Sequence, residues 1–301
     1  MGDGMSNPER WPSGFIAVDW GTTNRRAYLL DASGRQGAEF EDGQGVLAVA
    51  AGGFPDAVAE IRARLGDKPL LMAGMIGSNR GWVEAPYVSC PAGIAELAAG
   101  LAWPADNVAI VPGVSFTDSS SADVMRGEEV QLLGAFAAGL IPADCLVCHP
   151  GTHNKWATLS GGQIIGFRTI MTGELFNLLS EHSILSDLLA AEAQPDDAFA
   201  AGVDAGLSGA GLAAELFAVR ARVLLGHASR ADAPSFTSGL LIGSDVAIGL
   251  RDQSAGDVIV MGRPELTRLY AAAISQAGRT AIELDGEQSF IAGCTRIAEL
   301  I

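Results

Sequence analysis

Residues 15–30 constrain the fold more than any other stretch of the chain. An apolar run containing β-branched residues reaches Asp19, Gly21-Thr22-Thr23 then reverses the chain, and a second largely apolar run follows. Such runs favour strands, and a glycine followed by hydroxyl residues favours a tight turn between them. The backbone N–H groups of this turn are expected to converge on an anion, and Asp19 adds a carboxylate that suits a metal ion.

The same pattern returns 130 residues later. Residues 151–159 match residues 21–29 at five of nine positions, with Lys155 opposite Arg25. We interpret the two stretches as a duplicated hairpin that gives each of two related domains a phosphate-binding turn. The alternative is a pair of ordinary β-hairpins with chance identities, because one such turn alone is a weak motif.

Composition limits the classes of function. The 301 residues are 49% hydrophobic and 18% charged, which is ample for two cores. The net charge of −16 disfavours nucleic acid and anionic membrane surfaces as partners. No apolar run reaches the length of a membrane span, the opening residues lack the apolar part of a secretory signal, and only four cysteines are present. We therefore expect a soluble, cytoplasmic protein without a nucleic-acid or membrane partner.

Hydrophobic periodicity predicts alternating helices and strands after the first hairpin. Strands are expected at residues 37–40, 70–75, 108–111, 146–147, 163–167, 258–262 and 280–284. Helices are expected at residues 54–65, 94–101, 126–139, 173–189, 211–225, 235–250, 264–276 and 288–300. This order predicts an α/β protein with mixed sheets, each carrying an antiparallel hairpin. We expect an N-terminal domain over residues 1–144 and a C-terminal domain over residues 145–301.

Several longer motifs resemble the 2-dehydro-3-deoxygalactonokinase family, within the superfamily of sugar kinases, actin and Hsp70. They occupy residues 18–24, 72–82, 124–129, 150–156 and 167–175, so the resemblance spans nearly the whole chain. It implies an actin-like ATPase (ribonuclease H-like) fold, in which two related mixed-sheet domains flank an interdomain cleft. It also implies ATP-dependent phosphorylation of the terminal C6 hydroxyl of 2-dehydro-3-deoxy-D-galactonate, a step of galactonate breakdown.

Phosphoryl transfer requires a metal ion, groups that hold the transferred charge, and a carboxylate for the attacking hydroxyl. The resemblance implies ATP and Mg²⁺, with Asp19 near the metal through water; the alternative for Asp19 is a plain strand-end acid. The expected nucleotide ligands are Gly21, Thr22, Thr23, Arg25, Gly151, Thr152, Lys155 and, on the adenosine side, Gly262. His149 stands where relatives have an acid opposite Asp19, so a second carboxylate near the metal is not expected from the motif. Gly262 is single where many relatives have a glycine run, so nucleotide preference stays open.

The general base is expected at Glu128 or Glu129, where similar sugar kinases place a catalytic aspartate at a helix start. We favour Glu128, although two acids in a first helical turn also fit simple dipole complementarity. The substrate-binding candidates are Asn79, Arg80, Trp82, Arg126, Arg168 and Glu174. An arginine suits the substrate carboxylate, whereas an ordinary surface arginine and, for Glu174, a first-turn acid are the alternatives.

Two other functions remain open from the sequence. One is a kinase for another 2-keto-3-deoxy sugar acid, such as the gluconate epimer, which differs only in hydroxyl stereochemistry. The other is a nucleotide-gated protein of the same superfamily that hydrolyses ATP without a small acceptor. A homodimer is compatible with the resemblance, but the oligomeric state cannot be derived from these residues.

Overall fold

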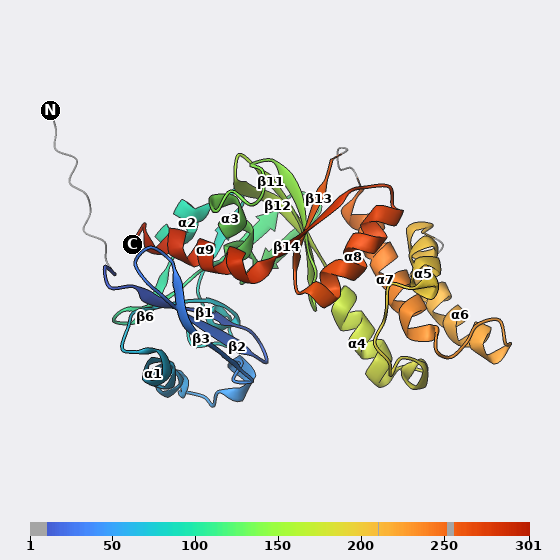
Figure 1. Cartoon of the computed structure of the whole chain (residues 1–301), viewed down its shortest axis with the longest axis horizontal. Coiled ribbons are helices and arrows are strands. Elements are labelled where there is room, and N and C mark those ends of the chain that lie inside the picture. Colours follow the sequence, from blue (N-terminus) through green and yellow to red (C-terminus); the bar gives the residue numbers. More distant parts are fainter. Residues whose placement is uncertain (1–10, 210, 252–255) are drawn as a thin grey trace. The chain divides into compact units, whose positions relative to one another are not determined.

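The computed structural model describes residues 11–209, 211–251 and 256–301 (Figure 1). The chain divides into two compact units. Unit 1 contains Met1–Asp144, Leu159–Gly166 and Glu287–Ile301, and unit 2 contains Cys145–Thr158 and Phe167–Gly286. The first break falls at the expected domain boundary, but two later segments belong with unit 1 and not with the second half of the chain.

Unit 1 is built on a six-stranded mixed sheet with the order β3-β2-β1-β4-β7-β6. Its strands are β1 (Phe15–Trp20), β2 (Arg25–Leu30), β3 (Gln36–Asp42), β4 (Leu70–Gly74), β6 (Ala102–Ala105) and β7 (Val108–Ile110). Strands β1, β4 and β7 run parallel, β2 and β3 form one antiparallel edge, and β6 pairs antiparallel with β7 at the other edge. A second sheet, which the sequence analysis did not predict, has the order β5-β8-β9 and contains β5 (Tyr87–Ser89), β8 (Gly113–Thr117) and β9 (Ala122–Met125).

The helical elements of unit 1 are η1 (Val46–Ala48), α1 (Phe54–Leu65), η2 (Met75–Gly77), α2 (Ile94–Ala99), α3 (Glu128–Ala137) and α9 (Gly286–Ala298). Helix α9 joins unit 1 because it packs closely on α3. A Cβ atom added at Gly134 would lie 2.0 Å from the Ser289 carbonyl oxygen, and one added at Gly293 would lie 2.2 Å from the Val130 carbonyl oxygen. Only glycine allows two helix backbones to approach this closely. The expected domain of residues 145–301 therefore differs from unit 2 at its end.

Unit 2 repeats the strand order of unit 1. Its five-stranded sheet runs β12-β11-β10-β13-β14, with β10 (Cys145–His149), β11 (Asn154–Ser160), β12 (Gln163–Ile170), β13 (Val258–Gly262) and β14 (Ala281–Asp285). Strands β10, β13 and β14 are parallel. The short connections from β10 to β11 to β12 require antiparallel pairing. Both sheets thus place two antiparallel hairpin strands beside parallel strands, as expected for an actin-like ATPase fold, and the predicted fold class is confirmed.

The helical elements of unit 2 are α4 (Thr172–His182), η3 (Ser186–Leu188), α5 (Asp197–Leu207), α6 (Leu212–Leu224), α7 (Ala233–Gly249) and α8 (Pro264–Gln276). Helix α5, which the sequence analysis missed, packs against α7 through glycines on both sides. A Cβ at Gly202 would lie 2.2 Å from the Phe236 carbonyl oxygen, and one at Gly243 would lie 2.5 Å from the Val203 carbonyl oxygen.

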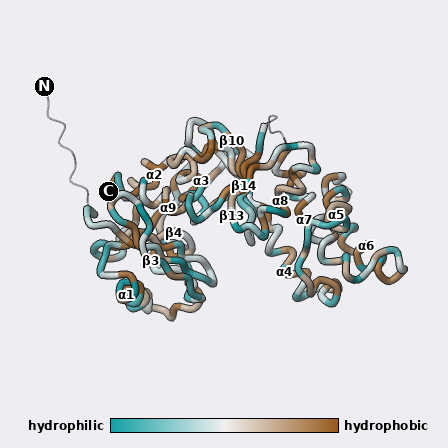
Figure 2. Tube along the Cα trace, viewed as in Figure 1, coloured by the Kyte–Doolittle hydropathy of each residue, from teal (hydrophilic) through white to brown (hydrophobic). Residues whose placement is uncertain are grey.

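Each unit has its own hydrophobic core. In unit 1, alternate residues of β1 and β4 pack against α1, with Ile16, Val18, Leu70 and Met72 fully buried. In unit 2, β10 and β13 pack against residues of α5, α7 and α8. Figure 2 shows hydrophobic stretches along the central strands of both units. No helix among the described residues is long and apolar enough to cross a membrane.

Candidate active site

The first turn, residues 21–24, joins β1 to β2 and is held from one side. The Gly21 amide donates to the Asn24 carbonyl at 2.9 Å, which closes the turn. The carbonyls of Gly21, Thr22 and Thr23 accept from the amides of Val46, Leu47 and Gly45 at 3.0, 3.2 and 3.0 Å, respectively. In a trans peptide the C=O and the following N–H point in opposite directions. The amides of Thr22, Thr23 and Asn24 therefore point away from residues 45–47, and these three residues are exposed, which suits an anion.

The carboxyl ends of β1 and β4 meet the start of α3. A Cβ at Gly74 would lie 3.4 Å from Asp19 Oδ1, and one at Gly127 would lie 3.2 Å from the Gly74 Cα. Gly127 has φ 110°, a conformation that favours glycine, and it immediately precedes Glu128. Ligands commonly bind at the carboxyl ends of parallel strands. Asp19 and the two glutamates therefore lie in one region of unit 1.

The two glutamates occupy different environments. Glu129 is fully buried, and both its carboxylate oxygens lie within 2.9 Å of the Gly127 amide. Burial, followed by the charge of Glu128, raises the pKa of Glu129 to about 8. Glu128 is only partly buried and accepts from the Arg126 amide at 3.0 Å. At neutral pH Glu129 is mostly protonated and enclosed, which makes Glu128 the better candidate for a base.

Arg126 lies directly before these acids. Its Nη2 donates to the Ala85 carbonyl at 2.8 Å, and its guanidinium lies 4.4 Å from the centre of the Tyr87 ring. Its Nε and Nη1 are buried and have no hydrogen-bond partner. A Cβ at Gly77 would lie 2.8 Å from Nη1, so the guanidinium packs closely over this glycine. Buried donors without partners are costly, which makes Arg126 a strong candidate for an anionic ligand.

The other candidates from the loop after β4 separate into two groups. Asn79 and Arg80 are exposed, so they can reach a solute. Trp82 is partly buried and stacks on Phe54, with ring centroids 6.4 Å apart at 11°, against the core of unit 1. This packing identifies Trp82 as an anchor of the loop.

Arg25 does not fit its expected role as a phosphate ligand. Its side chain is fully buried; Nε and Nη2 donate to Asp42 at 2.9 and 3.1 Å, and Nη2 also donates to Glu60 at 3.0 Å. The guanidinium also lies 5.3 Å from the Trp20 ring centroid. The sequence analysis missed this role because Asp42 and Glu60 lie 17 and 35 residues away. Arg25 ties the hairpin to β3 and α1.

The second turn, residues 151–153, joins β10 to β11 in unit 2. It is backed by the start of α4, where the Glu174 amide donates to the Thr152 carbonyl at 2.9 Å. A Cβ at Gly173 would lie 2.5 Å from the Gly151 carbonyl oxygen, which requires glycine there. Glu174 is a first-turn acid and pairs with His153. This contact agrees with the alternative role considered for Glu174.

The remaining candidates of unit 2 are spread over its sheet. Lys155, on β11, is buried and donates from Nζ to the Thr169 hydroxyl at 2.9 Å. Arg168, on β12, is exposed. Gly262 ends β13 with φ 151°, and α8 begins two residues later with Pro264 at its first position. Of these three residues, Gly262 lies where the carboxyl end of a parallel strand meets the start of a helix, a common position for ligands.

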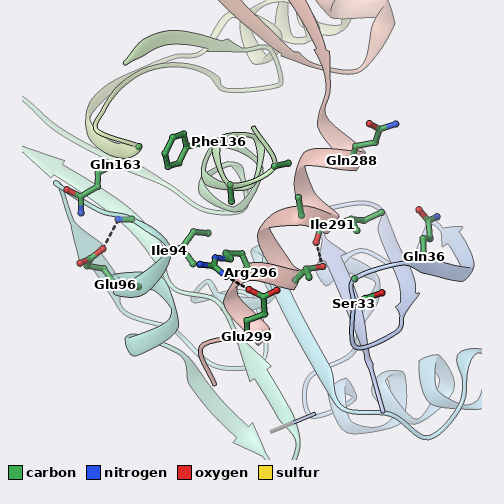
Figure 3. Close-up of a pocket in the computed structure, with 18 residues that line it drawn as sticks. Ser33, Gln36, Ile94, Glu96, Phe136, Gln163, Gln288, Ile291, Arg296 and Glu299 are labelled. Atoms are coloured by element: carbon green, nitrogen blue, oxygen red, sulfur yellow. Dashed lines mark hydrogen bonds and ion pairs between the residues drawn. The ribbon is translucent and has the colours of Figure 1, made fainter. Parts of the chain in front are cut away.

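An open pocket of about 970 Å³ in unit 1 contains none of the predicted site residues (Figure 3). Its charged side chains already have partners, because Arg296 pairs with Glu299 and Glu96 accepts from the Gly93 amide at 2.9 Å. It therefore lacks the open cation that a sugar acid or nucleotide requires. Among residues 11–209, 211–251 and 256–301, no group of three or more His, Cys, Asp or Glu side chains is arranged to hold a metal ion.

Known proteins resemble this chain over nearly its whole length. The sequence profile of the 2-keto-3-deoxy-galactonokinase family matches residues 19–297. The 2-dehydro-3-deoxygalactonokinase of Escherichia coli strain K12 is 39% identical over 292 residues, which cover 95% of this chain and 98% of that protein. A crystal structure from Sinorhizobium meliloti, of a protein assigned to the same activity, matches with a TM-score of 0.88 at 36% identity, covering 94% and 98% of the two chains. The chain belongs to the 2-keto-3-deoxy-galactonokinase family.

Proposed function

We propose that this protein transfers the γ-phosphoryl group of ATP to the C6 hydroxyl of 2-dehydro-3-deoxy-D-galactonate. The observation that carries the proposal is the family match over residues 19–297, which includes every site residue considered above. The 39% identity to the Escherichia coli 2-dehydro-3-deoxygalactonokinase over 95% of the chain supports the same substrate. The product would be the 6-phosphate, a step in the breakdown of galactonate.

The two turns are the proposed phosphate ligands. In unit 1 the Thr22 and Thr23 amides point away from the segment that holds their carbonyls, and in unit 2 Gly151 and Thr152 form the equivalent turn. Converging N–H groups stabilise the charge that develops on a transferring phosphoryl group. Lys155, on the strand after the second turn, is the proposed point charge.

Asp19 is the proposed carboxylate for Mg²⁺. Magnesium in phosphate sites keeps several waters and uses only one or two protein carboxylates. The structure fits this chemistry, because Asp19 lies at the carboxyl end of β1 beside Gly74, and a Cβ at residue 74 would approach its Oδ1 to 3.4 Å. When bound, the ion would offset negative charge on the phosphates.

Glu128 is the proposed general base. The C6 hydroxyl oxygen would attack the γ-phosphorus while the hydroxyl proton passes to a Glu128 carboxylate oxygen. The bond between the γ-phosphorus and the ADP oxygen would break in the same step. The position of Glu128 supports this role, because it is the first residue of α3 and follows the left-handed Gly127. Glu129 accepts a hydrogen bond from the Gly127 amide, and this bond would hold the loop that precedes Glu128.

Arg126 is the proposed partner of the substrate carboxylate. Its two partnerless nitrogens offer donors to an anion, and its place two residues before Glu128 links acid recognition to the base. Asn79 and Arg80, which are exposed in the loop after β4, are the proposed contacts to the sugar hydroxyls. Arg168 on β12 is the second candidate for the carboxylate.

The test is a coupled assay of ADP release with ATP and Mg²⁺. Four reactions are compared, with 2-dehydro-3-deoxygalactonate, its gluconate epimer, glucose, or no acceptor. We expect release only with the sugar acids and fastest with the galactonate derivative. Equal rates with and without acceptor would indicate that the protein hydrolyses ATP and is not a kinase. A higher kcat/KM with the gluconate epimer would make that epimer the preferred substrate.

A further inference from the structure

The buried carboxylate of Asp245 connects most of unit 2 around the second turn, yet none of the roles above uses it. Asp245 lies within α7 and is 1% exposed. Its oxygens accept from Asn154 Nδ2 at 2.8 and 3.0 Å, from Trp156 Nε1 at 2.6 Å, from the Tyr270 hydroxyl at 2.8 Å, and from the Thr172 hydroxyl. One side chain of α7 therefore joins β11, α4 and α8.

Two of these partners adjoin the second turn on opposite sides. Asn154 is fully buried and is the first residue of β11, directly after residues 151–153. Thr172 is the first residue of α4 and immediately precedes Gly173, which packs against the Gly151 carbonyl. The residue after Gly173 donates its amide to the Thr152 carbonyl. Asp245 thus fixes both the strand that leaves the turn and the helix that supports it.

The partners of Asp245 require an oxygen acceptor; burial raises the pKa of Asp245, and the hydrogen bonds that it accepts act in the opposite direction. The Asn154 amide nitrogen and the Trp156 indole nitrogen can only donate, and both contact Oδ1. Oδ2 receives the Thr172 and Tyr270 hydroxyls. Removing the acceptor would leave several buried donors unpaired, which is far more costly than losing an exposed hydrogen bond. Without this network, an apolar residue would be more stable at this buried position of α7 than an acid.

We propose that Asp245 is a positioning residue, whose carboxylate holds the second turn in the conformation that binds nucleotide phosphate. Only the binding of nucleotide phosphate rests on the proposed function, because the shape of the turn is a property of the protein without nucleotide. Asp245 acts through Asn154 and Thr172 and touches no phosphate itself.

The test compares Thr172→Val with Tyr270→Phe in the full-length protein. Each variant removes one hydroxyl from the same oxygen of Asp245, but Thr172 begins the helix behind the turn, whereas Tyr270 lies in α8. Thr172→Ser keeps the hydroxyl and serves as the rescue variant. Hydrogen exchange of a peptide covering residues 150–156 is measured without nucleotide, and the KM for ATP and kcat are then measured with saturating sugar acid.

We expect Thr172→Val to speed exchange of this peptide and to raise the KM for ATP, each by roughly tenfold, with a small change in kcat. Tyr270→Phe should lower the melting temperature without either effect, and Thr172→Ser should resemble the parent. Equal behaviour of the Val and Phe variants, in exchange or in KM, would reduce Asp245 to a general stabilising residue. If the parent neither binds ATP nor releases ADP, the proposed function fails, while the exchange comparison still decides whether Asp245 holds the turn.

Discussion

The two turns share the pattern Gly-Thr-x-Asn but are supported by different elements. The turn of unit 1 is supported by the loop of residues 45–47, and the turn of unit 2 by the start of α4. In both, a glycine contacts the turn so closely that a side chain would collide with backbone: Gly45 in unit 1 and Gly173 in unit 2. The supporting elements differ, but in both units a residue without a side chain packs against the turn.

The basic residues after the turns differ more. Arg25 is enclosed by Asp42 and Glu60, so its charge stabilises unit 1. Lys155 contacts the Thr169 hydroxyl and is the cation proposed for phosphate. The matching positions of the two hairpins thus have different neighbours, because acids surround Arg25 whereas a hydroxyl contacts Lys155.

The largest effect, on kcat, is expected at the proposed general base, which lies in unit 1. Glu128→Gln should lower kcat by roughly 10²–10⁴ and leave the KM for ATP and for the sugar acid nearly unchanged, because a base acts in the transition state. Steady-state kinetics with both substrates varied would measure this, with Glu129→Gln as the neighbouring control. A near-normal kcat for Glu128→Gln would remove the base from this position.

The contrast between the basic residues can be tested with matched substitutions. Arg25→Met should cost roughly 1.5–3 kcal/mol of unfolding free energy, because it removes charge-assisted hydrogen bonds to Asp42 and Glu60. Both acids keep Arg64 as a cationic partner. Lys155→Met should cost less stability and raise the KM for ATP instead. Urea unfolding and kinetics on both variants would measure this. If Arg25→Met raised the KM for ATP at unchanged stability, the two positions would be equivalent after all.

A third comparison asks which unit binds the substrate carboxylate. Arg126→Met should raise the KM for the sugar acid by roughly 10- to 100-fold with little change in the KM for ATP, as expected for a lost charge-assisted hydrogen bond. Arg168→Ala should change it less, because its side chain is exposed and solvent weakens such a bond. Kinetics over a range of acid concentrations would distinguish them, and the reverse order would assign the carboxylate to Arg168.

The smallest effect concerns pH and the buried acid of unit 1. The folded-state pKa of Glu129, about 8, lies above its ordinary value of 4.5, so the favourable contribution of the protonated group is lost as pH rises toward 8. Between pH 7 and pH 8, the parent should lose about 1 kcal/mol of unfolding free energy relative to Glu129→Gln. Urea unfolding of both proteins at each pH would measure this difference. A constant difference would show that Glu129 is already ionised at pH 7.

Much of the fold could be predicted because local patterns determine it. Helices α1 and α8 have the predicted bounds: α1 carries Pro55 near its start and is followed by Gly66 in a left-handed conformation, while α8 begins at Pro264. The sheet of β5, β8 and β9 was missed because its strands have three to five residues, too few for a clear alternation.

Roles that depend on distant partners could not be predicted in this way. The sequence indicates a cation at Arg25 but not the acids that enclose it. Asp245 was missed because a single acid in a helix normally faces solvent, and its donors come from residues 25 to 91 positions away. Glu128 and Glu129 look equivalent in sequence, and only the burial of Glu129 separates them.

Helix α9 has a consequence for the order in which the protein matures. It follows all of unit 2 in the chain but packs on α3, whose first residue is Glu128. During synthesis, domains tend to fold as their residues emerge, and contacts between distant segments form late. All residues of unit 2 therefore precede the last segment that unit 1 needs, residues 287–301. A released fragment that ends at residue 286 should therefore keep unit 2 folded but lack the contact of α9 with α3.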